Sequence, residues 1–279
     1  MDAFRHCENL VRERDKDRFL ATLFAPADKR RDLFALYAFD TEIASVQSKV
    51  REPLAGEVRL QYWHDLIAGG EAGANPTGQA LLEVTRRRAL PSEALLDLIE
   101  AHRFDIYEES FATFDELEVY AAKTSSALIE LAMQILDDSG TAEHAVARHA
   151  GIAYGLTGLL RSLAFHASHR KLYVPQEILA AHHVASADIL AGRSTLQLRA
   201  ALADIHEHAR HHLDRMRSGI ADLSNQLVPA LLPVTLVPGY LARMERGDYD
   251  PFRTRLEIPQ WRKQWRLWRA ARDPRRIAG

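Results

Sequence analysis

Residues 156–175 read LTGLLRSLAFHASHRKLYVP and form the most informative stretch of the chain. Their first part continues an Ala- and Leu-rich run that predicts one long helix over residues 141–165, and the last part predicts an extended link. Gly151, Gly155 and Gly158 fall on or near one side of this helix, and each weakens it by roughly 1 kcal/mol relative to alanine. Two explanations remain open: tight packing of another helix against this face, or the close approach of a ligand.

The chain on both sides of this stretch also has a helical pattern. Apolar residues recur every three or four positions, as in Leu33, Leu36, Ile43 and Val46, whereas alternating strand patterns are nearly absent. Helices without strands pack on one another, and no linker divides the chain, so we expect an all-α, single-domain fold. Further helices are expected over residues 33–50, 57–67, 91–106, 114–138, 194–223 and 226–246, with a loop over residues 69–78.

The composition excludes several classes of protein. The chain is 47% hydrophobic and has a formal net charge of −2, so it can bury a sizeable core and has no overall attraction for nucleic acid. The single cysteine, Cys7, excludes an internal disulfide and a cysteine metal site. The N-terminus lacks an apolar secretory signal, and prolines interrupt the most apolar run, residues 227–241. We therefore expect a cytoplasmic protein, either free or bound peripherally to the inner face of the membrane.

Several segments together resemble the squalene/phytoene synthases. The resemblance extends from about Phe19 to Tyr240, and the order and spacing of the segments agree with the family pattern. It implies an isoprenoid-synthase-type helical bundle around a central cavity, and Mg²⁺-dependent prenyl transfer on isoprenyl diphosphates. The segments that carry the resemblance are Leu36–Phe39 (LYAF), Arg59–Trp63 (RLQYW), Leu156–Arg161 (LTGLLR) and Arg170–Pro175 (RKLYVP).

The acidic residues that this chemistry requires are absent from both motifs. In the family, two aspartate-rich helical motifs hold Mg²⁺, which prefers oxygen ligands and stabilises the departing diphosphate. Asp40 and Glu42 lie near the first motif, but residues two apart on a helix point in different directions and cannot chelate one ion. We therefore predict that the chain has no catalytic residues, no metal site and no cofactor. The motif positions are occupied by Ala44, Ser45 and Ser48, and by Ser162, Phe165 and His166.

Two functions follow from the resemblance. Residues 161–175 and 56–63 look like a non-catalytic branch of the family that includes a mitochondrial complex I assembly factor. This implies a catalytically degenerate protein that assists assembly of respiratory NADH dehydrogenase or binds a lipid or isoprenoid. Its partners would be complex I subunits, other assembly factors or that ligand. The alternative is an active head-to-head prenyl transferase that uses Mg²⁺ and residues that the pattern does not identify.

A basic cluster stands where the family has its second acidic motif. It would suit an anionic head group or a diphosphate bound without metal, because guanidinium and ammonium groups pair with phosphate oxygens. The resemblance places Arg161 and Tyr173 on the cavity side. The other explanation is a solvated loop with structural neighbours. The candidate ligand-binding residues are Arg161, His166, His169, Arg170, Lys171 and Tyr173.

The C-terminal segment, residues 259–279, differs in composition from the domain over residues 1–258. Trp261, Trp265 and Trp268 recur at helical spacing and form one aromatic stripe. Tryptophan and arginine on a short amphipathic helix suit a membrane interface with anionic lipids, or docking onto a partner. Alternatively, the stripe packs on the bundle and the arginines face water. Beside the stripe lie Arg262, Arg266 and Arg269.

A second cluster of titratable residues, His206, His208, His211 and His212, invites comparison with metal sites. His208 and His212 share one helix face, but the order of the zinc-protease motif is absent. We therefore expect this cluster to be a solvated helix face.

Overall fold

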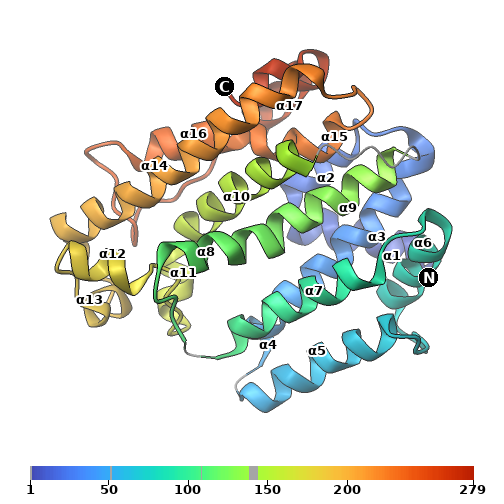
Figure 1. The fold of residues 1–279 in the computed structure, drawn as a ribbon, viewed down its shortest axis with the longest axis horizontal. Coiled ribbons are helices and arrows are strands. Elements are labelled where there is room, and N and C mark those ends of the chain that lie inside the picture. The colour runs from blue at the N-terminus through green and yellow to red at the C-terminus, as the bar shows by residue number, and fades with distance from the viewer. Residues whose placement is uncertain (1, 51, 108, 138–143) are drawn as a thin grey trace.

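The computed structural model describes residues 2–50, 52–107, 109–137 and 144–279 of the chain, and these residues form helices and connecting segments without a strand. The all-α prediction is confirmed (Figure 1). The α-helices are α1 (Ala3–Arg14), α2 (Lys16–Thr22), α3 (Ala27–Ala44), α4 (Val46–Lys49), α5 (Pro53–Ile67), α6 (Pro76–Arg88), α7 (Ser92–Arg103), α8 (Phe114–Ala121), α9 (Ala127–Leu136), α10 (His144–Arg161), α11 (Leu163–Ser168), α12 (Gln176–Ala181), α13 (Ser186–Leu190), α14 (Leu196–Gly219), α15 (Val228–Leu231), α16 (Val237–Met244) and α17 (Gln260–Arg272).

Several predicted helices are broken into shorter pieces. The helix expected over residues 114–138 contains a π-helical turn, η2 (Ala122–Ser126), between α8 and α9, and residue 138 lies outside the described part. The helix expected over residues 141–165 ends at Arg161 and restarts as α11, while residues 141–143 also lie outside it. The last predicted helix is divided into α15, the 3₁₀ helix η4 (Leu232–Leu236) and α16. Prolines explain this division, since a proline lacks the N–H that an uninterrupted helix needs.

Helix α10 packs against α14 on one side and against η2 and α9 on another (Figure 1). A Cβ atom on Gly151 would collide with the backbone of Ser126, and one on Gly155 would lie 2.9 Å from the Ser125 hydroxyl. Close helix packing therefore explains these two glycines. Gly158 differs, because a Cβ there would meet nothing within 4 Å.

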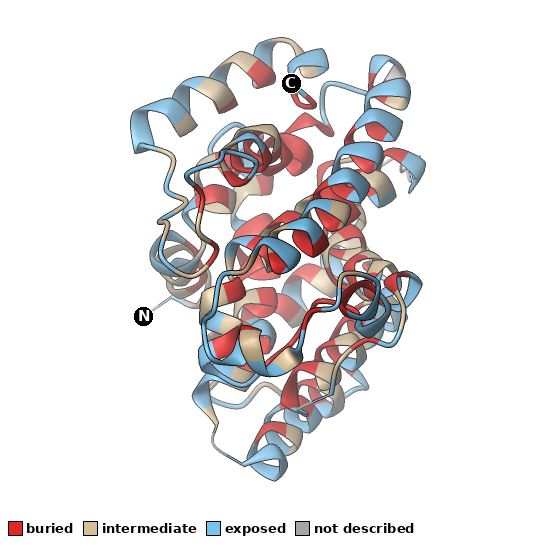
Figure 2. Cartoon of the chain, turned by 90° about the vertical axis from the view of Figure 1, so that its left-hand side faces the viewer, coloured by how far each residue is buried: buried red, intermediate tan, exposed pale blue. Residues whose placement is uncertain are grey.

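Helix α3 runs through the interior of the molecule. Ala35, Leu36, Ala38 and Phe39 are completely buried, so this helix is covered on several sides rather than on one face. It packs against α1, α6 and α9, and the buried residues of the surrounding helices turn toward the inside of the bundle (Figure 2). Burial of apolar surface is the main stabilising contribution to such a bundle.

The C-terminal segment packs onto the rest of the chain. Helix α17 contacts α2 and η4, and Leu267 and Ala270 of its inner face are completely buried. The ammonium group of Lys263 lies 2.6 Å from the Asp17 carboxylate on α2, which ties the helix to the N-terminal part. Across the residues that the structure describes, every helix is too short or too polar to span a bilayer.

Candidate functional site

The first family motif falls at the end of α3. Ala44 is exposed at the last position of the helix. The hydroxyl of Ser45 donates a hydrogen bond to the Glu42 carbonyl at 3.0 Å, and the hydroxyl of Ser48 donates to the Ser45 carbonyl at 3.0 Å. Both serines therefore satisfy the local backbone, and none of the three positions offers a carboxylate to a cation.

The second motif falls where α10 ends and α11 begins. Ser162 stands at the break between the two helices, and the ring of Phe165 is 49% exposed and lies 4.3 Å from the ring of His169. His166 is half-buried, and burial lowers its pKa to about 4, which leaves a neutral imidazole at pH 7.

These residues do not fit the Mg²⁺ ions that the fold family implies. Magnesium takes carboxylate oxygens, and the six motif positions supply hydroxyls, a methyl group, a phenyl ring and an imidazole. Within the described ranges, no group of three His, Cys, Asp or Glu side chains converges closely enough to hold a metal ion. The donor set thus disagrees with the family's metal chemistry.

Arg18 of α2 lies between α3 and α10. Its guanidinium carbon is 5.5 Å from the ring of Tyr37 on α3 and 5.3 Å from the ring of Tyr154 on α10. One of its nitrogens donates hydrogen bonds to Asp15 at 2.9 Å and to Asp40 at 3.0 Å. A cation of the chain itself therefore pairs with the carboxylates of this region.

Asp40 and Glu42 point to different neighbours, as the sequence predicts. Burial raises the pKa of the Asp40 carboxyl above its usual value, against the opposing effects of Arg18 and His102. Glu42 instead accepts a hydrogen bond from Thr77 at 3.2 Å. Since a buried carboxylate is strongly unfavourable without a partner, Asp40 depends on Arg18 and is not available as a metal ligand.

A second buried group of polar residues centres on Asp105. The hydroxyls of Tyr173 and Tyr120 donate to one of its oxygens at 2.6 and 2.8 Å, and a ring nitrogen of His102 lies 2.7 Å from the other. Burial lowers the pKa of His102, but the hydrogen bond and charge of Asp105 outweigh it and raise that pKa overall. The hydroxyls of both tyrosines and one ring nitrogen of His102 are thus bonded to Asp105 inside the bundle, while His102 Nε2 is buried without a hydrogen-bond partner among the described residues.

The interior next to this group is nearly filled by apolar side chains. A cavity bounded by Leu156, Leu160, Leu163, His166 and Tyr173, among others, has a volume of about 10 Å³. That is close to the smallest space that holds one water molecule. This cavity has no room for an isoprenoid chain.

The six predicted ligand-binding residues lie in three places. The guanidinium of Arg161 lies 4.1 Å from the centre of the Tyr240 ring, and 3.8 Å from the Asp17 carboxylate. His169 and Arg170 are exposed on the turn after α11, where Arg170 has a left-handed backbone with φ of 58°.

His166, Lys171 and Tyr173 lie together in the interior. The rings of His166 and Tyr173 are 4.6 Å apart, and the Lys171 ammonium donates to the Phe104 carbonyl at 3.4 Å. Lys171 is 3% exposed, so its charge is withdrawn from the surface. Anion binding by the whole cluster stays a prediction, because Lys171 and Tyr173 are buried whereas His169 and Arg170 are exposed.

The aromatic stripe of α17 faces outward. Trp261, Trp265 and Trp268 are 64%, 51% and 45% exposed, whereas Leu267 and Ala270 form the buried face. The alternative in which the tryptophans pack on the bundle is therefore wrong. A guanidinium group instead lies over each indole ring. The pairs are Arg262 over Trp261, Arg269 over Trp265 and Arg272 over Trp268, at 5.0, 4.4 and 4.1 Å from the ring centre.

The histidine cluster of α14 is only half solvated. His208 and His211 are exposed, as predicted, but His206 and His212 are buried, because α14 turns them toward its neighbours. His212 lies 2.9 Å from His149 of α10 and 3.3 Å from Glu118 of α8, measured between their polar atoms. The solvated-face prediction is therefore wrong for these two residues.

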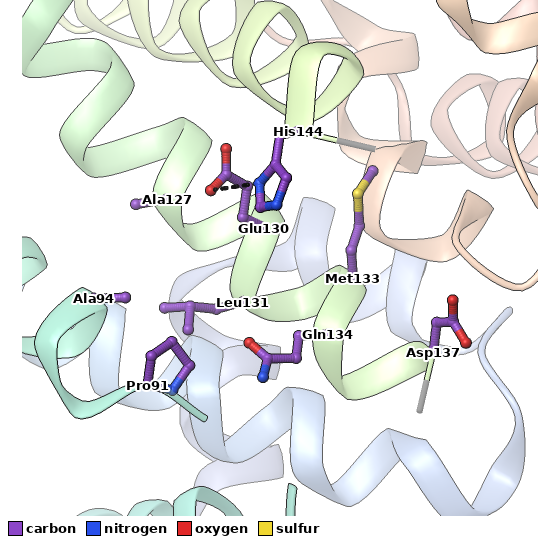
Figure 3. A pocket seen from close by; sticks show the side chains of 9 residues that line it. All are labelled: Pro91, Ala94, Ala127, Glu130, Leu131, Met133, Gln134, Asp137 and His144. Atoms are coloured by element: carbon purple, nitrogen blue, oxygen red, sulfur yellow. Dashed lines mark ion pairs between the residues drawn. The ribbon is translucent and has the colours of Figure 1, made fainter. Parts of the chain in front are cut away.

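A separate pocket of about 240 Å³ lies between α7, α9 and the start of α10 (Figure 3). Glu130 faces His144 across it at 3.4 Å, and Asp137 stands at the far end (Figure 3). Glu130 and Asp137 are seven residues apart, which separates them by roughly 10 Å along a helix. They are too far apart to coordinate the same ion, so the pocket offers no replacement for the missing acidic motifs.

The sequence did not reveal the residues that carry the buried charges. Arg18 meets Asp40 across 22 positions, and Tyr173 meets Asp105 across 68, so no local motif connects them. His102 gave the one usable signal, because it falls on the inner face of its predicted helix.

Comparisons with known proteins agree with this geometry. The sequence profile of the squalene/phytoene synthases matches residues 11–269. "NADH dehydrogenase (ubiquinone) complex I, assembly factor 6" of Bos taurus is 30% identical over 94% of this chain and 83% of the relative. The "15-cis-phytoene synthase" of Synechococcus elongatus is 24% identical over 94% of this chain and 90% of the enzyme.

A solved structure shows the same fold. The crystal structure of a dehydrosqualene synthase in complex with ligand superposes with a TM-score of 0.80, at 17% identity, over 96% of this chain and 94% of that one. The helical bundle, the match over nearly the whole length and the relatives agree, and the chain belongs to the squalene/phytoene synthase family.

Proposed function

We propose that this chain is a non-catalytic member of its family and acts as an assembly factor for respiratory NADH dehydrogenase, complex I. The observation that carries the proposal is the replacement of both acidic motifs, combined with the pairing of Asp40 with Arg18. The similarity to complex I assembly factor 6 supports the assembly role.

Ionisation of an allylic diphosphate places concentrated negative charge on the departing oxygen atoms, and removal of one stabilising group from such a site typically costs about 3–4 kcal/mol. Loss of two metal-binding clusters removes several such groups together. Arg18 does not compensate, because its side chain is only 13% exposed and is already bonded to Asp15 and Asp40.

The assembly role is tested by deleting the gene in the organism that encodes it. We expect less fully assembled NADH dehydrogenase on a native gel, and rescue by the wild-type chain. A normal level of the assembled complex in the deletion strain contradicts the assembly role.

The rival function is active head-to-head prenyl transfer, which the similarity to phytoene synthase favours. Incubation of the purified chain with farnesyl or geranylgeranyl diphosphate and Mg²⁺ separates the two, and we expect no release of diphosphate. A variant with Ala44→Asp, Ser45→Asp and Ser48→Asp should also be inactive, because the second motif is still missing. Turnover by the wild-type chain would establish the rival function.

We further propose that the outward stripe of α17 attaches the protein peripherally to the inner face of a membrane. Exposed tryptophans next to arginines support this role, because indole rings favour the interface and guanidinium groups attract anionic lipids. The narrow interior cavity supports a lipid contact at the surface rather than inside the bundle. Trp261→Ala, Trp265→Ala and Trp268→Ala together should reduce sedimentation with anionic vesicles, and unchanged sedimentation contradicts this contact.

A further inference from the structure

A basic pocket is lined by residues of α16, α17 and the C-terminus. Its volume is about 390 Å³, against about 10 Å³ for the interior cavity beside Tyr173. The side chains that matter here are Arg266, Arg269 and Arg276, which line it together with Trp265 and Thr235.

Gly239 of α16 makes room for one of these arginines. A Cβ atom at this position would collide with the guanidinium of Arg266, which lies across the helix backbone. Arg266 is half-buried there, and it has no hydrogen bond or ion pair to any residue in the described ranges. The N–H groups of this guanidinium are therefore available to an anion from outside the chain.

The neighbouring arginines leave donors available to the same anion. Arg269 stacks on Trp265 at 4.4 Å and pairs with no carboxylate of the described residues, so the in-plane N–H groups stay open. Arg276 forms an ion pair with Asp273 at 3.0 Å. Gly279, which also lines the pocket, accepts a hydrogen bond from Arg217. The pocket therefore keeps an excess of positive charge.

Thr235, which also lines the pocket, adds a neutral donor. The residue is 7% exposed, and its hydroxyl oxygen is buried without a hydrogen-bond partner in the described structure. Buried hydroxyls normally have a partner. This hydroxyl therefore has its hydrogen-bonding capacity left for a ligand.

We propose that this pocket binds the phosphomonoester head group of an anionic glycerophospholipid, of which phosphatidic acid is the simplest. A phosphomonoester offers three terminal oxygens and carries nearly two negative charges at pH 7, which matches several guanidinium forks and a hydroxyl. We assign the phosphomonoester to a membrane lipid because Trp265, which borders the pocket, belongs to the exposed stripe of α17. The inference rests on the proposed membrane contact and specifies the lipid that this contact selects.

The test compares vesicles of phosphatidylcholine that contain either phosphatidic acid or phosphatidylserine, adjusted to equal zeta potential. The full chain should bind the phosphatidic acid vesicles about tenfold more tightly, a difference of about 1.4 kcal/mol. Gly239→Ala should abolish this preference and keep the binding to phosphatidylserine, because it displaces Arg266 without changing any charge. Alanine also favours a helix over glycine, so the variant should fold.

Two further variants separate the pocket from general electrostatics. Arg266→Gln should also abolish the preference for phosphatidic acid. Arg262→Gln removes an equal charge beside Trp261, so it should weaken binding to both kinds of vesicle equally and leave the preference for phosphatidic acid unchanged. Equal binding of both vesicles by the wild-type chain, or an unchanged preference in Gly239→Ala, overturns the pocket assignment but not the membrane contact. Failure to bind either vesicle overturns both. Inorganic phosphate that binds as tightly as a short-chain phosphatidic acid overturns the lipid as the source.

Discussion

Replacement of Arg18 by methionine tests whether an internal cation holds the interior together. The variant keeps much of the side-chain volume but leaves the Asp40 carboxylate, which is 8% exposed, without its cation. Loss of one partner of a buried ion pair costs about 3–5 kcal/mol. With an unfolding entropy of about 2.1 cal/mol/K per residue, the melting temperature should fall by about 5–9 °C at pH 7.

The loss of stability caused by Arg18→Met should be smaller at acidic pH. Burial already raises the pKa of Asp40 in the folded chain, and removal of Arg18 removes an effect that opposes this rise. A carboxyl whose folded pKa lies above its unfolded value of about 4 begins to destabilise the fold as the pH rises past the unfolded value, and its full effect is present once the pH exceeds the folded pKa. The difference from the wild-type chain should therefore be smaller at pH 5 than at pH 7.

The assay is thermal and urea unfolding followed by circular dichroism, with two comparison variants. Arg18→Met combined with Asp40→Leu removes both charges and should recover most of the stability, because an apolar pair often replaces a buried ion pair without loss. Arg12→Met removes an exposed pair with Glu8 and should cost less than about 1 kcal/mol. If Arg18→Met is as stable as Arg12→Met at pH 7, or if the double variant is no better than the single one, the reasoning about Arg18 is wrong.

The remaining predictions use the same unfolding assay. Gly151→Ala should destabilise the chain by at least about 1–3 kcal/mol through collision with the π-helical turn, whereas Gly158→Ala has open space and should gain up to about 1 kcal/mol. Burial lowers the pKa of His206 to about 4, so this residue should lower the stability by up to about 3 kcal/mol as the pH drops from 6.5 to 4, and His206→Leu should remove this contribution and leave that of His166. Tyr173→Phe removes the 2.6 Å hydrogen bond to Asp105 and should cost about 1–3 kcal/mol. Equal stabilities of Gly151→Ala and Gly158→Ala would contradict the packing argument. An unchanged pH profile in His206→Leu would contradict the role of His206, and a Tyr173→Phe variant as stable as the wild-type chain would contradict the role of the hydrogen bond.

The helical class and the loss of the metal motifs could be predicted from local patterns. Spacing of three or four positions predicted the helices, and the identity of residues such as Ala44 and Phe165 was enough to exclude Mg²⁺ ligands there. The separation of Asp40 from Glu42 also followed from helix geometry, and the structure confirms it through their different partners.

The breaks within the helices followed less directly from the pattern. Periodicity detects an apolar face but not a π turn such as residues 122–126, whose backbone at Ser126 lies close to Gly151 of another helix. The same limit applies to the α14 histidines, since their burial depends on what packs against the helix.

The sequence by itself determined that this chain is a helical member of its family without the family's acidic motifs, because residue identity and spacing are local properties. Only the tertiary structure decided that Arg18 pairs with Asp40, that the tryptophans of α17 face outward and that Arg266 lies over Gly239 without a carboxylate. The physical reason is that the energy of a charge or an indole ring depends on its neighbours in space, and folding brings those neighbours from distant parts of the chain.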